Sequence, residues 1–249
     1  MSHADETFLR TRMLLGEDAV DRLRGSAVAV FGIGGVGSYA AEALIRAGVG
    51  KLIFIDPDTV APSNLNRQLV ALHSTIGRNK AEVMRERALD INPAAEVQAL
   101  SVFYDATTDA ALDTSGWSYI IDAIDTVTSK LLLIERAVRD NIPIISCMGT
   151  GNKLDPSRLE IADIYDTSVC PLARVMRAEL RKRGVFALKT VYSREQPRAP
   201  LDISGHEASS HETSSHETSR RATPASISFV PSSAGLLLAG EVIRALANY

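Results

Sequence analysis

A glycine-rich turn, GIGGVG, separates a short apolar run from a run of small residues, and its glycines are Gly32, Gly34, Gly35 and Gly37. Such a turn lets the backbone approach a ligand closely, and the free N–H groups at the start of the following helix favour an anion. Asp56 ends the next apolar run, where its carboxylate can accept hydrogen bonds from ribose hydroxyls. The pattern predicts a nucleotide site. NAD, ATP and a glycine turn without a ligand all remain open at this point.

The charged residues farther along the chain suit a triphosphate better than a nicotinamide ring. Arg67 and Lys80 are expected on the same loop face, where they can neutralise charge that develops on the α-phosphorus during displacement. Asp125, in the sequence DAID, is placed to hold magnesium, which prefers one or two carboxylates together with phosphate oxygens. Each residue alone could equally belong to a surface ion pair, but the joint pattern favours ATP. Neutral hydrogen-bond partners for the same pocket are Asn64 and Asn66.

Alternating apolar and amphipathic stretches must position these residues. Apolar runs predict buried strands over 27–31, 51–56, 96–100, 119–123, 143–146 and 226–230. Helices are predicted over 7–23, 38–47, 80–91, 129–140, 171–183 and 234–247. This order predicts an α/β fold: a Rossmann-like, mostly parallel sheet with helices on both faces and a C-terminal strand–helix extension.

Residues 201–223 differ in kind from the rest of the chain. They contain GHEAS-SHETS-SHETS, a five-residue repeat that places histidines at 206, 211 and 216. Such a tract cannot form a core, so it predicts a disordered surface insertion rather than a fixed metal site. Because a predicted strand and helix follow it, residues 1–249 are expected to form one domain that the tract interrupts.

Several motifs together resemble a known superfamily: GIGGVGS, IDPD, SNLNRQ, GRNK, INP and DAID. Over about residues 10–149 the chain is similar to the ThiF/MoeB/ubiquitin-activating superfamily of ATP-dependent enzymes that adenylate carboxylates. The resemblance implies that Asp56 binds ribose, that Arg67 and Lys80 bind phosphates, and that Asp125 binds magnesium. It also implies a homodimer in which Arg10, from the N-terminal helix, reaches the partner's ATP.

The C-terminal third contains DTSVCPLARVMR, ELRKRGV and SISFVPSSAG, and resembles the TcdA (CsdL) group, the tRNA threonylcarbamoyladenosine dehydratases. This implies adenylation of the carboxylate of N6-threonylcarbamoyladenosine in tRNA, followed by intramolecular closure that releases AMP. Closure by a group already in the substrate is efficient because effective molarities reach ~10⁵ M or more. The alternative within the superfamily is activation of the C-terminal glycine of a sulfur-carrier or ubiquitin-like protein.

The cysteines fit a reaction that needs no enzyme thiol. Sulfur-carrier activators usually have two CxxC zinc pairs, whereas this chain has only Cys147 and Cys170. Cys147 is expected to be structural. Cys170 lies at a predicted helix start, where a thiol can be nucleophilic, but without an obvious histidine partner a packing role is favoured.

One local patch could contact RNA. Residues 171–191 contain six basic residues and only one glutamate. Arg174, Arg177 and Arg181 are spaced so that they share one face of the predicted helix. We interpret these three as contacts to tRNA phosphates, with a solvated charged face as the alternative.

Net charge and the distribution of apolar residues limit the classes of function that this chain can have. The formal net charge is −3, so any nucleic-acid contact must be local. The N-terminus lacks the apolar run of a signal peptide, and residues 227–247 are interrupted by proline and charges, so no membrane span is expected. We therefore expect a cytoplasmic enzyme that uses ATP and magnesium. The sequence leaves open a monovalent cation near the site and a sulfur-relay partner protein. An NAD-dependent oxidoreductase and an inactive ThiF-like binding module remain as rival functions.

Overall fold

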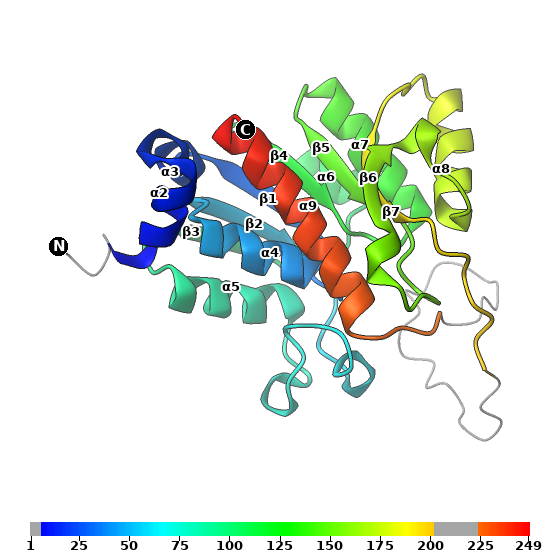
Figure 1. The fold of residues 1–249 in the computed structure, drawn as a ribbon, viewed down its shortest axis with the longest axis horizontal. Helices are drawn as coiled ribbons and strands as arrows, with labels where there is room; N and C mark the ends of the chain where they lie inside the picture. The colour runs from blue at the N-terminus through cyan, green and yellow to red at the C-terminus, as the bar shows by residue number, and fades with distance from the viewer. Residues whose placement is uncertain (1–5, 202–223) are drawn as a thin grey trace.

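A seven-stranded sheet forms the centre of the protein in a computed structural model, which describes residues 6–201 and 224–249 (Figure 1). The strand order is β3-β2-β1-β4-β5-β7-β6; neighbouring strands are parallel except that β6 runs antiparallel to β7. The strands are β1 Ala27–Phe31, β2 Lys51–Ile55, β3 Glu96–Leu100, β4 Tyr119–Asp122, β5 Ile144–Cys147, β6 Leu159–Asp163 and β7 Lys189–Ser193. The predicted α/β fold is confirmed.

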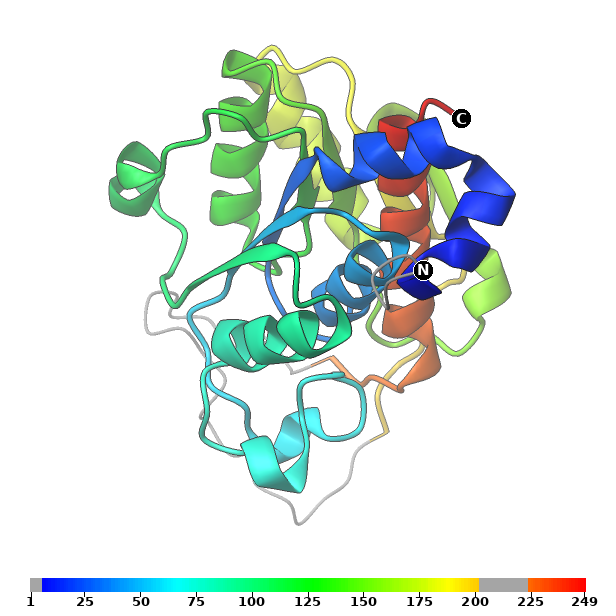
Figure 2. The same cartoon turned by 90° about the vertical axis from the view of Figure 1, so that its left-hand side faces the viewer.

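Helices cover both faces of the sheet, as predicted. Figure 2 shows α7 and α9 on opposite sides of the strands; α4 and α5 lie on the α9 face, and α8 packs with α7 on the other. The α-helices are α2 Leu9–Leu15, α3 Glu17–Arg24, α4 Gly37–Ala47, α5 Lys80–Ile91, α6 Ala106–Ala111, α7 Val127–Arg139, α8 Pro171–Lys182 and α9 Phe229–Ala247. Short 3₁₀ turns are η1 Pro62–Asn64, η2 His73–Thr75, η3 Pro156–Arg158 and η4 Ile164–Asp166.

Burial explains why these sequences form these elements. All five residues of β1 are buried, because a parallel strand covered by helices on both faces has no solvent side. The helix α9 is long and apolar enough to cross a membrane by length and composition alone. In the fold it packs against α4 and α3, and Leu238 and Val242 are fully buried in the main core. The core of this protein thus accounts for part of its apolar character, since 39% of its most apolar stretch is buried.

The structure corrects two of the predicted elements and adds two strands to the sheet. The predicted helix 7–23 is two helices separated at Gly16, whose φ of 84° breaks the helical path. The predicted strand 226–230 is wrong: α9 already begins at Phe229, and Pro231 is accommodated in its first turn, where no N–H partner is needed. Strands β6 and β7 were not predicted, so the far edge of the sheet comes from residues 159–193. Of the predicted insertion 201–223, residues 202–223 lie outside the described residues.

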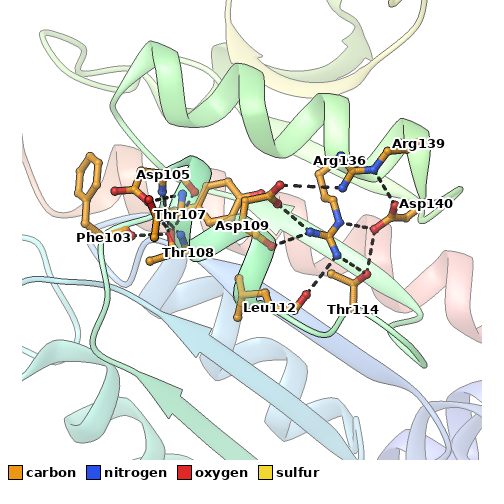
Figure 3. A network of polar contacts seen from close by, with 11 residues as sticks. Phe103, Asp105, Thr107, Thr108, Asp109, Leu112, Thr114, Arg136, Arg139 and Asp140 are labelled. Atoms are coloured by element: carbon orange, nitrogen blue, oxygen red, sulfur yellow. Dashed lines mark hydrogen bonds and ion pairs between the residues drawn. The ribbon is translucent and has the colours of Figure 1, made fainter.

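A partly buried polar network joins α6 to α7 (Figure 3). The guanidinium of Arg136 forms ion pairs with Asp109 and Asp140 and donates to the carbonyl oxygen of Leu112 at 3.1 Å. Tyr104 donates to the Asp109 carboxylate at 2.5 Å. Burial and the Asp109 carboxylate raise the pKa of Tyr104, so its hydroxyl remains a donor. The network fixes the connection between β3 and β4 against α7.

Candidate nucleotide site

The glycine turn lies between β1 and α4, at the carboxyl end of the sheet. A Cβ on Gly32, whose φ is 87°, would come within 2.6 Å of the Ala123 carbonyl oxygen, and one on Gly37 within 1.7 Å of the Gly32 carbonyl oxygen. Both positions are closed to a side chain because the turn packs tightly on the end of β4 and on itself. Gly34 differs, because the nearest atom to its Cβ would be Gln68 Nε2, at 3.8 Å. The turn therefore presents an uncovered backbone at Gly34, as close approach of a phosphate requires.

Asp56 follows β2 and ties the turn to the sheet. Its side chain is buried; Oδ2 accepts from the backbone N–H of Ile33 at 2.5 Å and Oδ1 from that of Asp58 at 2.9 Å. Burial raises the pKa of Asp56, while the charge of Lys80 and the two backbone donors oppose that shift. The carboxylate thus fixes the backbone of the turn, and each oxygen retains a second lone pair for a further donor. Its contact to ribose stays a prediction.

Lys80 is the first residue of α5, and its side chain lies near Asp56 and Asp58. The helix is capped by Asn79, whose side chain accepts from the N–H of Glu82 at 3.3 Å. The Lys80 side chain is only 6% exposed, and its Nζ lies 2.9 Å from Asp58 Oδ2, on a side chain that is 63% exposed. A nearly buried ammonium thus faces a carboxylate that can move into solvent.

The segment before Arg67 folds around its own polar side chains. Asn64 is buried and its Oδ1 accepts from the N–H of Ala61 at 3.1 Å, which closes the turn η1. Arg67 Nη1 donates to the Ser63 carbonyl oxygen at 2.8 Å and to Asn66 Oδ1 at 2.9 Å.

This segment also reaches the glycine turn and the start of α9. A Cβ on Gly35 would lie 3.4 Å from Arg67 Cγ and 3.3 Å from Pro231 Cβ. Asn66 Nδ2 donates to the Ser226 carbonyl oxygen at 3.1 Å. Arg67 is therefore brought to the turn as expected, whereas Asn64 is committed to the local fold and Asn66 to holding residue 226.

The two aspartates of DAID have different surroundings. Asp122, the last residue of β4, is fully buried. Asp125 is exposed, and the hydroxyl of Thr126 donates to its Oδ1 at 3.3 Å. A carboxylate with this much open coordination space fits a cation that keeps water and phosphate oxygens as its other ligands. The structure thus leaves the Asp125 carboxylate exposed, and its binding of magnesium stays a prediction.

Two residues at this edge were missed in the sequence. Lys130, in the first turns of α7, lies 2.9 Å from Asp122 Oδ2, and the hydroxyl of Ser146 in β5 donates to the same oxygen at 2.6 Å. A lysine in the apolar stretch SKLLLI was the available signal, because a charged residue on a buried helix face requires a partner.

Arg10 lies far from the nucleotide site of its own chain. It is exposed on α2, and that helix is preceded by Phe8, which packs beside Gly48 at the amino end of β2. The glycine turn is at the carboxyl end, and a strand of five residues spans about 16 Å. Arg10 can therefore serve this kind of site only in a second copy of the chain.

The three arginines predicted to contact tRNA are used differently in the structure. Arg177 donates to the carbonyl oxygen of Thr167 at 3.0 Å and also to its hydroxyl, and the Arg181 guanidinium lies 5.2 Å from the ring centre of Tyr165. Arg174 is exposed, and its guanidinium forms no hydrogen bond or ion pair within the described ranges. Other cations of this patch are paired with carboxylates: Lys182 and Arg183 with Glu179, and Lys189 with Glu241. Of the three, Arg177 is bound to Thr167, whereas Arg174 and Arg181 are exposed and neither guanidinium forms a hydrogen bond or ion pair with the described residues.

The cysteines are both buried, as a packing role predicts. Burial raises the pKa of Cys147 to about 12. Cys170 caps α8 ahead of Pro171, and its backbone N–H donates to the Ser168 carbonyl oxygen at 2.5 Å around Val169, whose φ is 51°. This tight turn places the thiol inside the fold.

Comparisons with known proteins agree with this geometry. A profile of the ThiF family matches residues 8–249. The chain is 42% identical to a tRNA threonylcarbamoyladenosine dehydratase from Bacillus subtilis, over 96% of this chain and 94% of that protein. It is 38% identical to the Escherichia coli protein of the same name, over 76% and 74% of the two chains. A crystal structure of E. coli tRNA N6-threonylcarbamoyladenosine dehydratase, TcdA, in complex with ATP superposes with a TM-score of 0.86 at 32% identity and covers 99% of this chain and 96% of that one.

Proposed function

Because the chain belongs to the ThiF family, we propose that it uses ATP to adenylate the carboxylate of N6-threonylcarbamoyladenosine in tRNA and that the activated substrate then closes into a ring. Residues 1–249 act in this reaction as one adenylating domain. One structural observation carries the proposal: the charge of the nearly buried Lys80 ammonium acts on Asp56, the carboxylate that ties down the glycine turn, and its ion-pair partner Asp58 is exposed and displaceable. A polyphosphate can replace Asp58 as the anion beside this ammonium.

The reaction balances without an enzyme nucleophile. A carboxylate oxygen of the substrate attacks the α-phosphorus and pyrophosphate leaves, which produces an acyl-adenylate. A nucleophile of the same threonylcarbamoyl group then attacks the activated carbonyl carbon, AMP leaves, and a proton is released. The modified nucleoside has lost one water. Because the nucleophile is already attached, the enzyme needs only to hold the group and exclude competing water.

The residues of the site supply binding and charge. The backbone N–H groups of the glycine turn and the cations Arg67 and Lys80 bind the phosphates, where a fixed positive charge favours the displacement. Asp56 accepts from the ribose hydroxyls with its free lone pairs. Asp125 holds the magnesium that accompanies ATP. Magnesium itself supplies charge neutralisation at the phosphate oxygens.

A homodimer completes the proposed site. The exposed position of Arg10 at the opposite end of the sheet means that it can reach phosphates only in a partner subunit. The same helix exposes Met13 and Leu14, each at 79%, and apolar side chains of this size favour contact with another surface. We place the enzyme in the cytoplasm, where its tRNA substrate is found.

The decisive experiment combines purified protein, ATP, magnesium and tRNA that carries threonylcarbamoyladenosine. Mass spectrometry of the digested nucleosides should show the loss of one water, with AMP formed in equal amount. Unmodified tRNA should produce neither. Unchanged nucleosides under conditions in which the protein binds ATP would refute the proposal.

The same preparation separates the rival functions. A carrier-protein activator would exchange pyrophosphate into ATP only when a protein with a C-terminal glycine is added. An NAD-dependent oxidoreductase would bind NADH and would be indifferent to Arg67→Ala.

A further inference from the structure

Lys130 is a fully buried cation directly behind the segment that carries Asp125. Its Nζ lies 2.9 Å from Asp122 Oδ2 and donates to the carbonyl oxygens of Cys147 at 2.9 Å and Ile124 at 3.1 Å. An ammonium has three donors, and here three acceptors from β4, β5 and the segment after β4 take them. No donor is left for a substrate, so Lys130 can act only through the groups it holds.

One of those groups, Ile124, lies in the segment that adjoins the proposed nucleotide site. Both backbone polar groups of Ile124 are hydrogen-bonded. Its N–H donates to Asp122 Oδ1 at 3.1 Å, and its carbonyl oxygen accepts from Lys130. The residue after it is Asp125. The residue before it is Ala123, whose carbonyl oxygen leaves no room for a Cβ on Gly32. One short segment thus supports both the glycine turn and the magnesium-binding carboxylate.

Stability alone does not account for a charged pair at this place. A buried ion pair loses so much hydration that apolar residues of similar volume are often as stabilising. The ammonium does what an apolar side chain cannot: it holds two carbonyl oxygens at the strand ends, where the regular sheet pairing stops. We propose that Lys130 is a positioning residue of the adenylation site, which fixes the Ala123–Asp125 segment so that Asp125 meets magnesium and the phosphates. This inference rests on the proposed function.

The test uses the double variant Asp122→Asn/Lys130→Met. Lys130→Met alone would leave a buried carboxylate without its cation, so Asp122→Asn removes that charge as well. The double variant keeps the approximate volume and loses the ammonium that holds Ile124. A second variant, Ser146→Ala, keeps the ion pair and removes only the hydroxyl that orients Asp122.

A matched control lies on the same helix. Arg136→Met disrupts the other ion network of α7, which is partly buried, joins α6 to the helix and, among the described residues, forms no hydrogen bond or ion pair with the Asp122–Asp125 segment. It should lower the melting temperature without touching the site.

The main readout is the magnesium concentration that gives half-maximal ATP binding, measured by calorimetry, with AMP formation as a second readout. Loss of a residue that orients a metal ligand costs about 10- to 100-fold in metal affinity. We expect a shift of that size for the double variant, a smaller shift in the same direction for Ser146→Ala, and none for Arg136→Met.

The outcomes separate the two proposals. A folded double variant with the wild-type magnesium requirement, or an equal shift in Arg136→Met, would overturn the positioning role of Lys130. If the double variant does not fold, Ser146→Ala decides: an unchanged magnesium requirement refutes the inference and a raised one supports it. A wild-type protein that neither binds ATP nor forms AMP from modified tRNA would instead refute the proposed function.

Discussion

Gly34→Ala should separate ATP binding from folding, because the two demands on this residue differ. The added methyl group would have Gln68 Nε2 as its nearest neighbour, at 3.8 Å, which is ordinary van der Waals distance. Gly34 is also outside the positive-φ residues, so alanine can adopt its backbone conformation. A glycine-to-alanine change at such a position stabilises by about 0.4–1 kcal/mol, because the unfolded chain loses freedom. We expect a melting temperature equal to that of the wild type or up to about 4 °C higher.

The effect on ATP should have the opposite sign. A phosphate oxygen that accepts from a backbone N–H of the turn must approach to about 2.9 Å, and a methyl group on that side keeps it farther away. A hydrogen bond to a charged group contributes about 1.5–3 kcal/mol. Loss of one such bond therefore raises the Kd for ATP roughly 10- to 100-fold.

Calorimetric titration of ATP with magnesium, together with thermal unfolding, tests both halves. The control is Gly25→Ala at the end of α3, where a Cβ would lie 3.5 Å from the Asp21 carbonyl oxygen and where no part of the proposed site is near. Gly25→Ala should leave ATP affinity unchanged. Wild-type ATP affinity in Gly34→Ala would show that phosphates do not lie over this turn, and a clearly lower melting temperature would show that the space around Gly34 is misjudged.

Three further changes test separate parts of the site. Lys80→Met should lower the rate of AMP formation about 100-fold or more, measured in single turnovers, since it removes a fixed charge from the phosphates; a rate within a few-fold of wild type would contradict this. Arg174→Ala should weaken tRNA binding and reduce its salt dependence by about one unit of slope at an unchanged melting temperature. Arg177→Ala, by contrast, loses its bonds to Thr167 and should destabilise by about 1–3 kcal/mol in chemical denaturation. Because burial raises the pKa of Cys147 to about 12, this thiol should resist alkylation at pH 8 until the protein is unfolded. Mass spectrometry measures the rate of labelling, and labelling of the native protein at the rate of a free cysteine would refute this.

The glycine turn and its partners could be predicted because their signals are local. β1 and β2 are short apolar runs, and a parallel sheet puts the residue after each strand at one edge, so Gly32 and Asp56 had to meet. Arg67 and Lys80 are close in the sequence, so both cations had to lie between the end of β2 and the start of α5. The structure brings Arg67 against the turn and Lys80 beside Asp58.

The far edge of the sheet was harder to predict. Strands β6 and β7 have short mixed sequences, LEIAD and KTVYS, whose pairing depends on each other and on β5. The sequence SISFV has the composition of a strand, but it lies where Phe229 already begins α9. Whether such a segment becomes strand or helix depends on which neighbour it meets, and that neighbour is distant in the chain.

The order of apolar and amphipathic segments was enough to determine the α/β class and the position of the glycine turn, because these follow from periodicity and from the nearest neighbours along the chain. The assignment of Arg67, Lys80 and Asp125 to a ligand at that turn rests on motifs and stays a prediction. Only the tertiary structure decided how each charge is used: Lys130 holds Asp122 and Ile124, Arg177 is bound to Thr167, and Arg10 stands at the opposite end of the sheet from the glycine turn. The reason is that a charged side chain has the same sequence signal whether it faces solvent, a ligand or a buried partner. The partner is fixed by contacts between segments that meet only after the chain has folded.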